Sequence, residues 1–311
     1  MPAVIDRAVA IAPATVGNVA VGFDALGHAL TGPVDRVTAR RSDVCGVRIV
    51  RIGGVAGDLP RDPVLNTAGR AVLELVEASD IDFGIEIEID KGIPPGSGLG
   101  GSGASAVAAA VAANALLPEP FALPGLLDFA LAGEAAATGS PVTDNVAPSL
   151  YGGLVLALPG NPVFVERVPI PSDLRCVLAR PALRIDTRDA REMLAPQCPL
   201  PLAVIQASHL AGLIAGCYAG NLALVARSLD DVLIEPQRAQ LVPGFADVKK
   251  AARDAGALGC SLSGSGPSVF AWACSADAGK VSSAMTATFA AHGIECTASI
   301  SRIDASGARC V

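Results

Sequence analysis

Apolar and polar residues alternate strictly over one short stretch of the chain. Ile85, Ile87 and Ile89 alternate with acidic residues, and this period of two predicts a half-buried strand over 84–90. The segments 13–32 and 138–149 are rich in small and polar residues, and they predict irregular loops. The remaining apolar runs of the first half predict strands over 7–12, 34–40, 46–52 and 152–158, and helices over 64–78, 104–116 and 124–138.

The tetrapeptide Pro-Gly-Asn-Pro at 159–162 is the strongest turn signal in the chain, and it predicts a boundary between domains 1–160 and 161–311. The second half, like the first, mixes strand-like and helix-like apolar patterns. The fold class is therefore expected to be α+β with largely antiparallel sheets. Its runs predict strands over 175–179 and 295–300, a hairpin of 259–263 with 268–273, and helices over 189–194, 202–218, 222–229, 244–255 and 276–291.

Composition narrows the class of protein. The chain has 311 residues, of which 51% are hydrophobic and 4% aromatic, and its net charge is −7. This charge argues against a nucleic-acid-binding surface, although a local loop can still hold a nucleotide. The eight Cys show no C-x-x-C spacing, so they are expected to be reduced core residues rather than zinc ligands. With no signal-peptide pattern and no uninterrupted apolar run of about 18 residues, we expect a cytoplasmic protein without a membrane span.

A glycine-rich loop joins the alternating strand to the following helix. Backbone N–H groups without a neighbouring Cβ, together with a helix N-terminus, predict a phosphate-binding site. The loop has neither the lysine of a Walker motif nor the spacing of a dinucleotide fingerprint. Its residues are Pro94, Pro95, Gly96, Ser97, Gly98, Leu99, Gly100, Gly101, Ser102, Gly103 and Ala104.

Three other segments carry polar residues within apolar surroundings. Segment 12–24 holds Asn18 and Asp24, which by themselves are more typical of a capped turn than of a site. Glu134 lies on an alanine-rich helix, where a solvated position is the alternative, and the pair Asp144-Asn145 follows it. Segment 263–268 is a second glycine turn, which alone predicts only a hairpin.

Together these four segments resemble the GHMP kinases, a family that includes galactokinase, mevalonate kinase and homoserine kinase. Segments 21–27, 144–148, 209–212, 235–238 and 241–245 are similar to the homoserine kinase branch. The resemblance implies an N-terminal domain like ribosomal protein S5 domain 2 and a ferredoxin-like C-terminal domain. It also implies phosphorylation of L-homoserine by ATP to O-phospho-L-homoserine, a step of threonine biosynthesis, in a homodimer.

The resemblance implies a role for each candidate site residue. Asp24, with Asn18 beside it, would bind the ammonium group of homoserine, Arg191 and Arg238 would bind its carboxylate, and Thr187 would line the same pocket. Asn145 would position the reacting hydroxyl, with Asp144 mainly structural. Glu134 and Ser102 would hold Mg²⁺, and Asn66 would lie near the adenine.

Two positions depart from the family pattern. Gly101 stands where the phosphate loop usually has a serine, and Val142 stands where many homoserine kinases have a histidine. The alternatives left open are a GHMP kinase acting on mevalonate, a sugar or another amino alcohol, a catalytically silent ligand sensor, and a soluble binding domain whose glycine loops are only turns.

Overall fold

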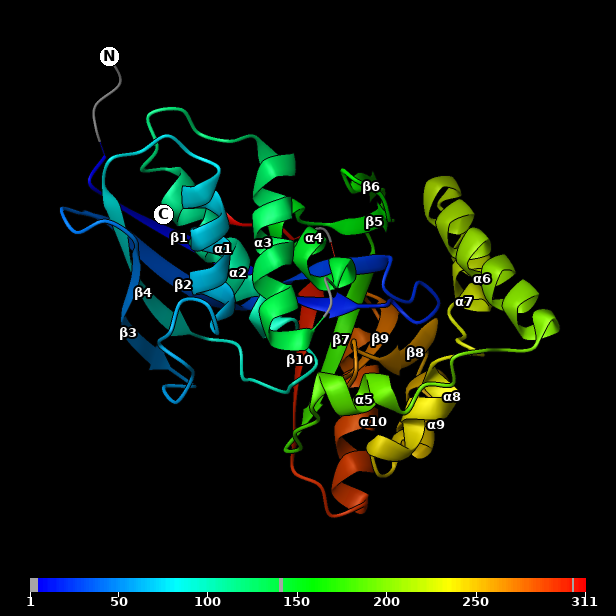
Figure 1. Ribbon diagram of the computed structural model, residues 1–311. Helices are drawn as coiled ribbons and strands as arrows, with labels where there is room; N and C mark the ends of the chain where they lie inside the picture. The colour runs from blue at the N-terminus through cyan, green and yellow to red at the C-terminus, as the bar shows by residue number, and fades with distance from the viewer. Residues whose placement is uncertain (1–4, 140–141, 304) are drawn as a thin grey trace.

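The computed structural model describes residues 5–139, 142–303 and 305–311. They form two β-sheets with helices packed on them (Figure 1). The first sheet has the strand order β11-β1-β2-β4-β3, with β5 on β2 and β6 on β5; β3 pairs with β4 in parallel and the other pairs are antiparallel. Its strands are β1 (Arg7–Gly17), β2 (Leu26–Ser42), β3 (Val47–Gly54), β4 (Gly84–Lys91), β5 (Leu154–Leu158), β6 (Phe164–Val168) and β11 (Arg309–Cys310).

One helix lies at the centre of the first layer. Helix α2 (Gly101–Asn114) packs against β1 and β2, and α1 (Thr67–Glu77) and α3 (Leu123–Thr138) pack against α2. Residues 103–110 of α2 are all buried, because alanine, glycine and serine side chains are small enough to leave room for neighbours on every side. Helix α4 (Thr143–Tyr151) packs beside them (Figure 1). The phosphate-loop helix is therefore held by the core on all sides.

The second sheet is antiparallel, with the strand order β10-β7-β9-β8. Its strands are β7 (Leu174–Pro181), β8 (Gly259–Leu262), β9 (Val269–Cys274) and β10 (Cys296–Arg302). Successive side chains of β9 point to opposite faces. Val269 and Ala271 pack towards α9 (Phe245–Asp254) and α10 (Ala278–Ala291), whereas Phe270 and Trp272 pack into the core shared with the first sheet.

The remaining helices all lie in the chain between β7 and β8. The pair α6 (Leu200–Ala219) and α7 (Leu222–Ser228) stands at the right-hand edge of the view in Figure 1, and α6 is long and apolar enough to cross a membrane by length and composition. Only 22% of its apolar window is buried. The others are the short helices α5 (Thr187–Glu192), α8 (Glu235–Arg238) and η1 (Ala239–Leu241).

The α+β prediction and most elements are confirmed, but two predicted loops are wrong. Segment 13–32 is partly strand, since β1 runs on to Gly17 and β2 begins at Leu26, and segment 138–149 contains most of α4; residues 140–141 lie outside the described part. Polar residues interrupt the apolar period in both segments, among them the buried Thr15 and His28 and the residues Asp144 and Asn145 of α4. Strands β6 and β11 lie beyond the predicted boundary at 160 yet complete the first sheet.

The cysteine prediction needs a correction. Only Cys176, Cys217 and Cys260 are buried, whereas Cys45, Cys198 and Cys310 are exposed and the other two are half-buried. All eight are free thiols. Within the described residues, no group of three His, Cys, Asp or Glu side chains is arranged to hold a metal ion.

Candidate active site

The glycine loop lies between the end of β4 and the start of α2. Gly98 has a φ of 75°, and a Cβ there would come within 2.5 Å of the carbonyl oxygen of Gly266. Gly100, the N-cap of α2, has a φ of 65° and no room for a Cβ beside the Thr15 hydroxyl. Only glycine meets both demands. Because the N-cap residue Gly100 has no side chain, it cannot cap the first N–H groups of α2. These N–H groups are therefore suited to binding an anion.

The turn 263–267 holds the loop from the side of the second sheet. The Ser263 hydroxyl donates to the Gly98 carbonyl at 2.6 Å, and the Ser268 N–H donates to the Ser97 carbonyl at 3.3 Å. Two glycine segments more than 150 residues apart in sequence thus form one structure, and the second is more than a hairpin turn.

A buried ion pair beneath the loop was missed by the sequence analysis. The Lys91 ammonium pairs with Asp35 and donates to the Gly101 carbonyl at 2.6 Å and the Ser105 hydroxyl at 2.8 Å. The other Asp35 oxygen accepts the N–H groups of Gly92 and Ile93 at 3.0 Å. The sequence contained an indication of this pair: in the alternating strand, Lys91 stands two residues after Ile89, on the same face as the buried Ile85, Ile87 and Ile89.

Ser102 and Glu134 meet across the groove between α2 and α3. The Ser102 hydroxyl donates to a Glu134 carboxylate oxygen at 2.9 Å, and Glu134 is only 4% exposed. Burial raises the pKa of Glu134 to about 7, although the Ser102 hydrogen bond and the Lys91 charge act in the opposite direction. Two hard oxygen donors therefore lie side by side at the N-terminus of α2. The alternative of a solvated Glu134 is excluded by its burial.

The Asp144-Asn145 pair opens helix α4. Asp144 accepts the Asn18 N–H at 2.7 Å and the Asn145 amide at 3.2 Å, and the Asn145 oxygen accepts the Thr15 hydroxyl at 2.8 Å. Burial, and next the negative charge of Asp24, raise the pKa of Asp144 to about 7. Asp144 is thus occupied with backbone and amide donors, while Asn145 keeps an edge towards the hollow.

The far end of the site carries opposite charges. One nitrogen of Arg191 donates to both Asp24 oxygens, at 2.7 and 2.9 Å, and the backbone N–H of Asp24 donates to the Asn18 side-chain oxygen at 3.1 Å. Arg238 is 3% exposed and donates to backbone carbonyls of Ala190 and Gly264. Both guanidinium groups lie over the Phe23 ring, at 5.5 and 5.4 Å.

This segment is conformationally strained. Asn18, Val19, Ala20 and Asp24 all have positive φ angles, between 40° and 64°. Such angles cost about 1–3 kcal/mol each for residues other than glycine and concentrate at functional sites. The interpretation of 12–24 as an ordinary capped turn is therefore insufficient.

These groups line a single hollow of about 610 Å³. Of the predicted residues it includes Asn18, Asp24, Pro94, Gly96, Ser97, Gly98, Leu99, Gly100, Gly101, Ser102, Glu134, Asp144, Asn145, Thr187, Arg191 and Arg238. Gly264 and Ser265 also line it, and sequence reasoning gave neither a role. Of the two departures, Val142 lines the hollow, and a Cβ on Gly101 would stand 3.0 Å from the Ile93 side chain.

Four predicted residues do not line this hollow: Asn66, Pro95, Gly103 and Ala104. Asn66 is the N-cap of α1, where its side-chain oxygen accepts the N–H groups of Ala68 and Gly69 and its amide donates to the Pro60 carbonyl. Its side chain is thus used for capping. Gly103 and Ala104 are buried inside α2.

Comparison with known proteins places this site in a family. The model of the GHMP kinase N-terminal domain matches residues 66–153, and that of the GHMP kinase C-terminal region matches residues 213–291. A homoserine kinase of Xanthomonas campestris pv. campestris is 47% identical over 98% of this chain and 94% of its own length. One from Xylella fastidiosa is 46% identical over 97% of the chain and 94% of its own length.

Solved structures agree. The crystal structure of homoserine kinase from Cytophaga hutchinsonii is similar with a TM-score of 0.95 and 44% identity, covering 100% of this chain and 99% of that one. The L. major mevalonate kinase, solved with R-mevalonate, has a TM-score of 0.68 at 17% identity over 95% and 96% of the two chains, which supports the fold alone. This chain therefore belongs to the GHMP kinase family.

Proposed function

We propose that the chain transfers the γ-phosphoryl group of ATP to the side-chain hydroxyl of L-homoserine, giving O-phospho-L-homoserine and ADP as a step of threonine biosynthesis in the cytoplasm. The observation that carries the proposal is the Asp24–Arg191 ion pair, 2.7 Å long, in the hollow that also holds the phosphate loop. A zwitterionic amino acid can replace this pair, with its ammonium on Asp24 and its carboxylate on the two arginines.

Each end of the substrate then has a counterpart. Asn145 would bind the hydroxyl, whose oxygen attacks the γ-phosphorus as the bond to the ADP oxygen breaks. The hydroxyl proton would pass to the transferred phosphoryl group, since Asp144 is held by Asn18 and Asn145. The loop N–H groups and the α2 N-terminus would bind the phosphates. Asn66, Pro95, Gly103 and Ala104 would support the ATP site from outside the hollow.

Ser102 and Glu134 fit Mg²⁺, because they offer a hydroxyl and a carboxylate to a cation that prefers oxygen ligands and retains waters. Bound Mg²⁺ would neutralise charge on the β- and γ-phosphates. The hydrogen bond between the two side chains keeps both oriented towards the phosphate loop.

The substrate assignment is tested by coupled ADP release with Mg-ATP and a panel of alcohols. L-homoserine should be turned over, whereas 4-hydroxybutyrate, which lacks the ammonium, and 3-aminopropanol, which lacks the carboxylate, should lose most of kcat/KM. Mevalonate and galactose should give no activity. Turnover of mevalonate or 4-hydroxybutyrate in preference to homoserine would contradict the proposal.

Asp144→Asn should keep kcat within about tenfold of the unchanged protein, because a general base would be worth roughly 10²–10⁴-fold and Asp144 instead holds Asn18 and Asn145. Steady-state kinetics with homoserine measure this. A fall of kcat by several orders of magnitude would make Asp144 the base.

The same variant has a second readout in the pH dependence of stability. Folding raises the pKa of Asp144 from 3.8 to about 7, so between these values the folded protein binds more protons and its free energy of unfolding falls as pH rises. Urea titrations of the ligand-free protein from pH 5 to 8 should show a smaller fall for Asp144→Asn. An unchanged slope would mean that Asp144 is ionised in the folded protein.

We further propose a homodimer that forms through α6. Residues 193–226 contain no Asp, Glu, Lys or Arg, and Leu200, Val204 and Tyr218 are exposed by 76%, 57% and 57%. Two copies with a charge of −7 each repel one another, and an uncharged face is where they can meet. A lipid surface is less suitable, because α6 lacks the basic residues that anchor interfacial helices.

Val204→Glu combined with Ala211→Glu, two exposed positions on α6, should convert the dimer to a monomer, since charges would be buried at the contact. Light scattering after size exclusion at about 10 µM measures this against a chain mass of 31.1 kDa. Val50→Glu, on an exposed position of β3, is the matched control and should remain dimeric. A monomeric starting protein, a dimeric variant, or association with lipid vesicles would each contradict the proposal.

A further inference from the structure

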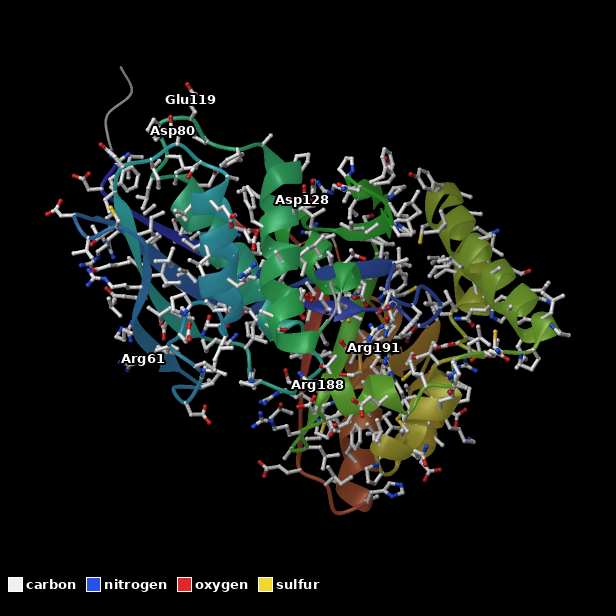
Figure 2. The ribbon with its side chains drawn as sticks, in the orientation of Figure 1. Arg61, Asp80, Glu119, Asp128, Arg188 and Arg191 are labelled. Atoms are coloured by element: carbon white, nitrogen blue, oxygen red, sulfur yellow. The ribbon has the colours of Figure 1, made fainter. Side chains whose placement is uncertain are left out.

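Two arginines lie along the outer side of the phosphate loop. The Ile185 N–H donates to the Gly96 carbonyl at 3.2 Å, which attaches segment 184–188 to the loop. A Cβ on Gly96 would stand 2.5 Å from Cγ of Arg184, so the aliphatic stem of Arg184 lies across this glycine. Arg188 follows Thr187 in helix α5, and Figure 2 shows Arg188 and Arg191 in this region at the centre of the molecule.

The two arginines border a hollow of their own, about 470 Å³ in volume. It shares Gly96, Ser102 and Thr187 with the hollow of the candidate active site described above. Gly96 and Ser102 belong to the phosphate loop, and Ser102 is also a candidate magnesium ligand. Thr187 is the first residue of α5. A polyphosphate bound at the loop would therefore lie within reach of both hollows.

Other cations near the loop are already engaged. Within the described residues, Arg191 pairs with Asp24, Arg238 donates to backbone carbonyls, and Lys91 pairs with Asp35 beneath the loop. The guanidinium groups of Arg184 and Arg188 have no hydrogen bond or ion pair in this part of the chain, and both residues are exposed. In a chain with a net charge of −7, two unpaired cations beside an anion site need an explanation.

We propose that Arg184 and Arg188 bind the terminal phosphates of ATP and supply the positive charge that a Walker lysine supplies in other nucleotide-binding loops. Guanidinium groups suit this role because they bind phosphate oxygens with two parallel hydrogen bonds. The inference rests on the proposed function only in that the bound nucleotide is ATP. It does not depend on which alcohol accepts the phosphoryl group. It makes the C-terminal half of the chain a contributor to nucleotide binding.

The test is the double variant Arg184→Gln/Arg188→Gln. Calorimetry without acceptor should show a dissociation constant for Mg-ADP raised roughly 5- to 20-fold, as expected for two exposed charge-assisted contacts, with that of AMP unchanged because AMP has no β-phosphate. KM for ATP should rise similarly and KM for homoserine should stay within about twofold. The Arg184→Lys/Arg188→Lys variant should recover part of the loss.

Arg40→Gln/Arg48→Gln is the matched control, since it removes the same charge from exposed ion pairs on β2 and β3. The dissociation constant of Mg-ADP should also depend less on KCl concentration in the Arg184/Arg188 variant than in the control. An unchanged Mg-ADP constant, or equal losses for Mg-ADP and AMP, would overturn the inference. If homoserine is not a substrate but Mg-ADP binding weakens, the acceptor assignment fails and this inference stands.

Discussion

Replacing Glu134 by glutamine is expected to lower kcat by roughly 10²–10⁴-fold, the range in which removal of a group that stabilises transition-state charge falls. The Glu134 carboxylate is buried beside Ser102 at the start of α2. Glutamine keeps the shape and one oxygen but removes the charge that would hold Mg²⁺ against the phosphates. KM for homoserine should change little, because Asp24, Arg191 and Arg238, which would bind the two charged ends of homoserine, lie at the other end of the site from the phosphate loop.

The measurement is steady-state ADP release over a range of Mg²⁺ concentrations. The concentration of Mg²⁺ that gives half-maximal rate should rise along with the loss of kcat. Glu77→Gln, at the exposed end of α1, removes the same charge far from the hollow and should behave as the unchanged protein. A Glu134→Gln enzyme with kcat within tenfold of normal would exclude Glu134 as the magnesium ligand.

Lys91→Met is expected to lower the free energy of unfolding by about 3–5 kcal/mol, the typical cost of breaking one side of a buried ion pair. Asp35 is fully buried, and without Lys91 its charge keeps only the N–H groups of Gly92 and Ile93 and the Ser105 hydroxyl. The loss also releases the Gly101 carbonyl at the start of α2. Urea unfolding followed by circular dichroism measures the effect.

Neutralising the partner provides the internal check. Lys91→Met with Asp35→Asn should recover a large part of the lost stability, because no unpaired charge is then left in the core. Lys250→Met, which removes an exposed lysine paired with Asp254, should change stability by no more than about 0.5 kcal/mol. A Lys91→Met protein as stable as the Lys250→Met control would show that the ion pair contributes nothing net.

Most regular elements could be predicted because their burial follows a simple period. β4 buries every second residue, and α2 is buried on nearly all sides because it is built of small residues. Elements at the site broke this rule. β1 continues to Gly17 and α4 begins at Thr143. Thr15 of β1 is buried and donates to Asn145, and Asp144 and Asn145 of α4 line the hollow, so these polar residues make the sequence there typical of loops.

Site residues could be nominated from motifs, but their partners could not. Asp144 and Asn18 are 126 positions apart and are joined by one 2.7 Å hydrogen bond. Arg191 reaches Asp24 from the other half of the chain. No local pattern encodes such distances, because they depend on how β1, α4 and α5 pack. Asn66, which the resemblance places near the adenine, caps helix α1 with its side chain, and the motif alone did not indicate this contact.

The sequence by itself determined the period of its strands and helices, the anion-binding character of the glycine loop and the membership of a kinase family, because each depends on residues close together in the chain. Only the tertiary structure decided that the loop rests on a buried Asp35–Lys91 pair and is attached to segments 184–188 and 263–268. The physical reason is that burial and charge pairing are set by packing between distant segments, which a local pattern does not contain.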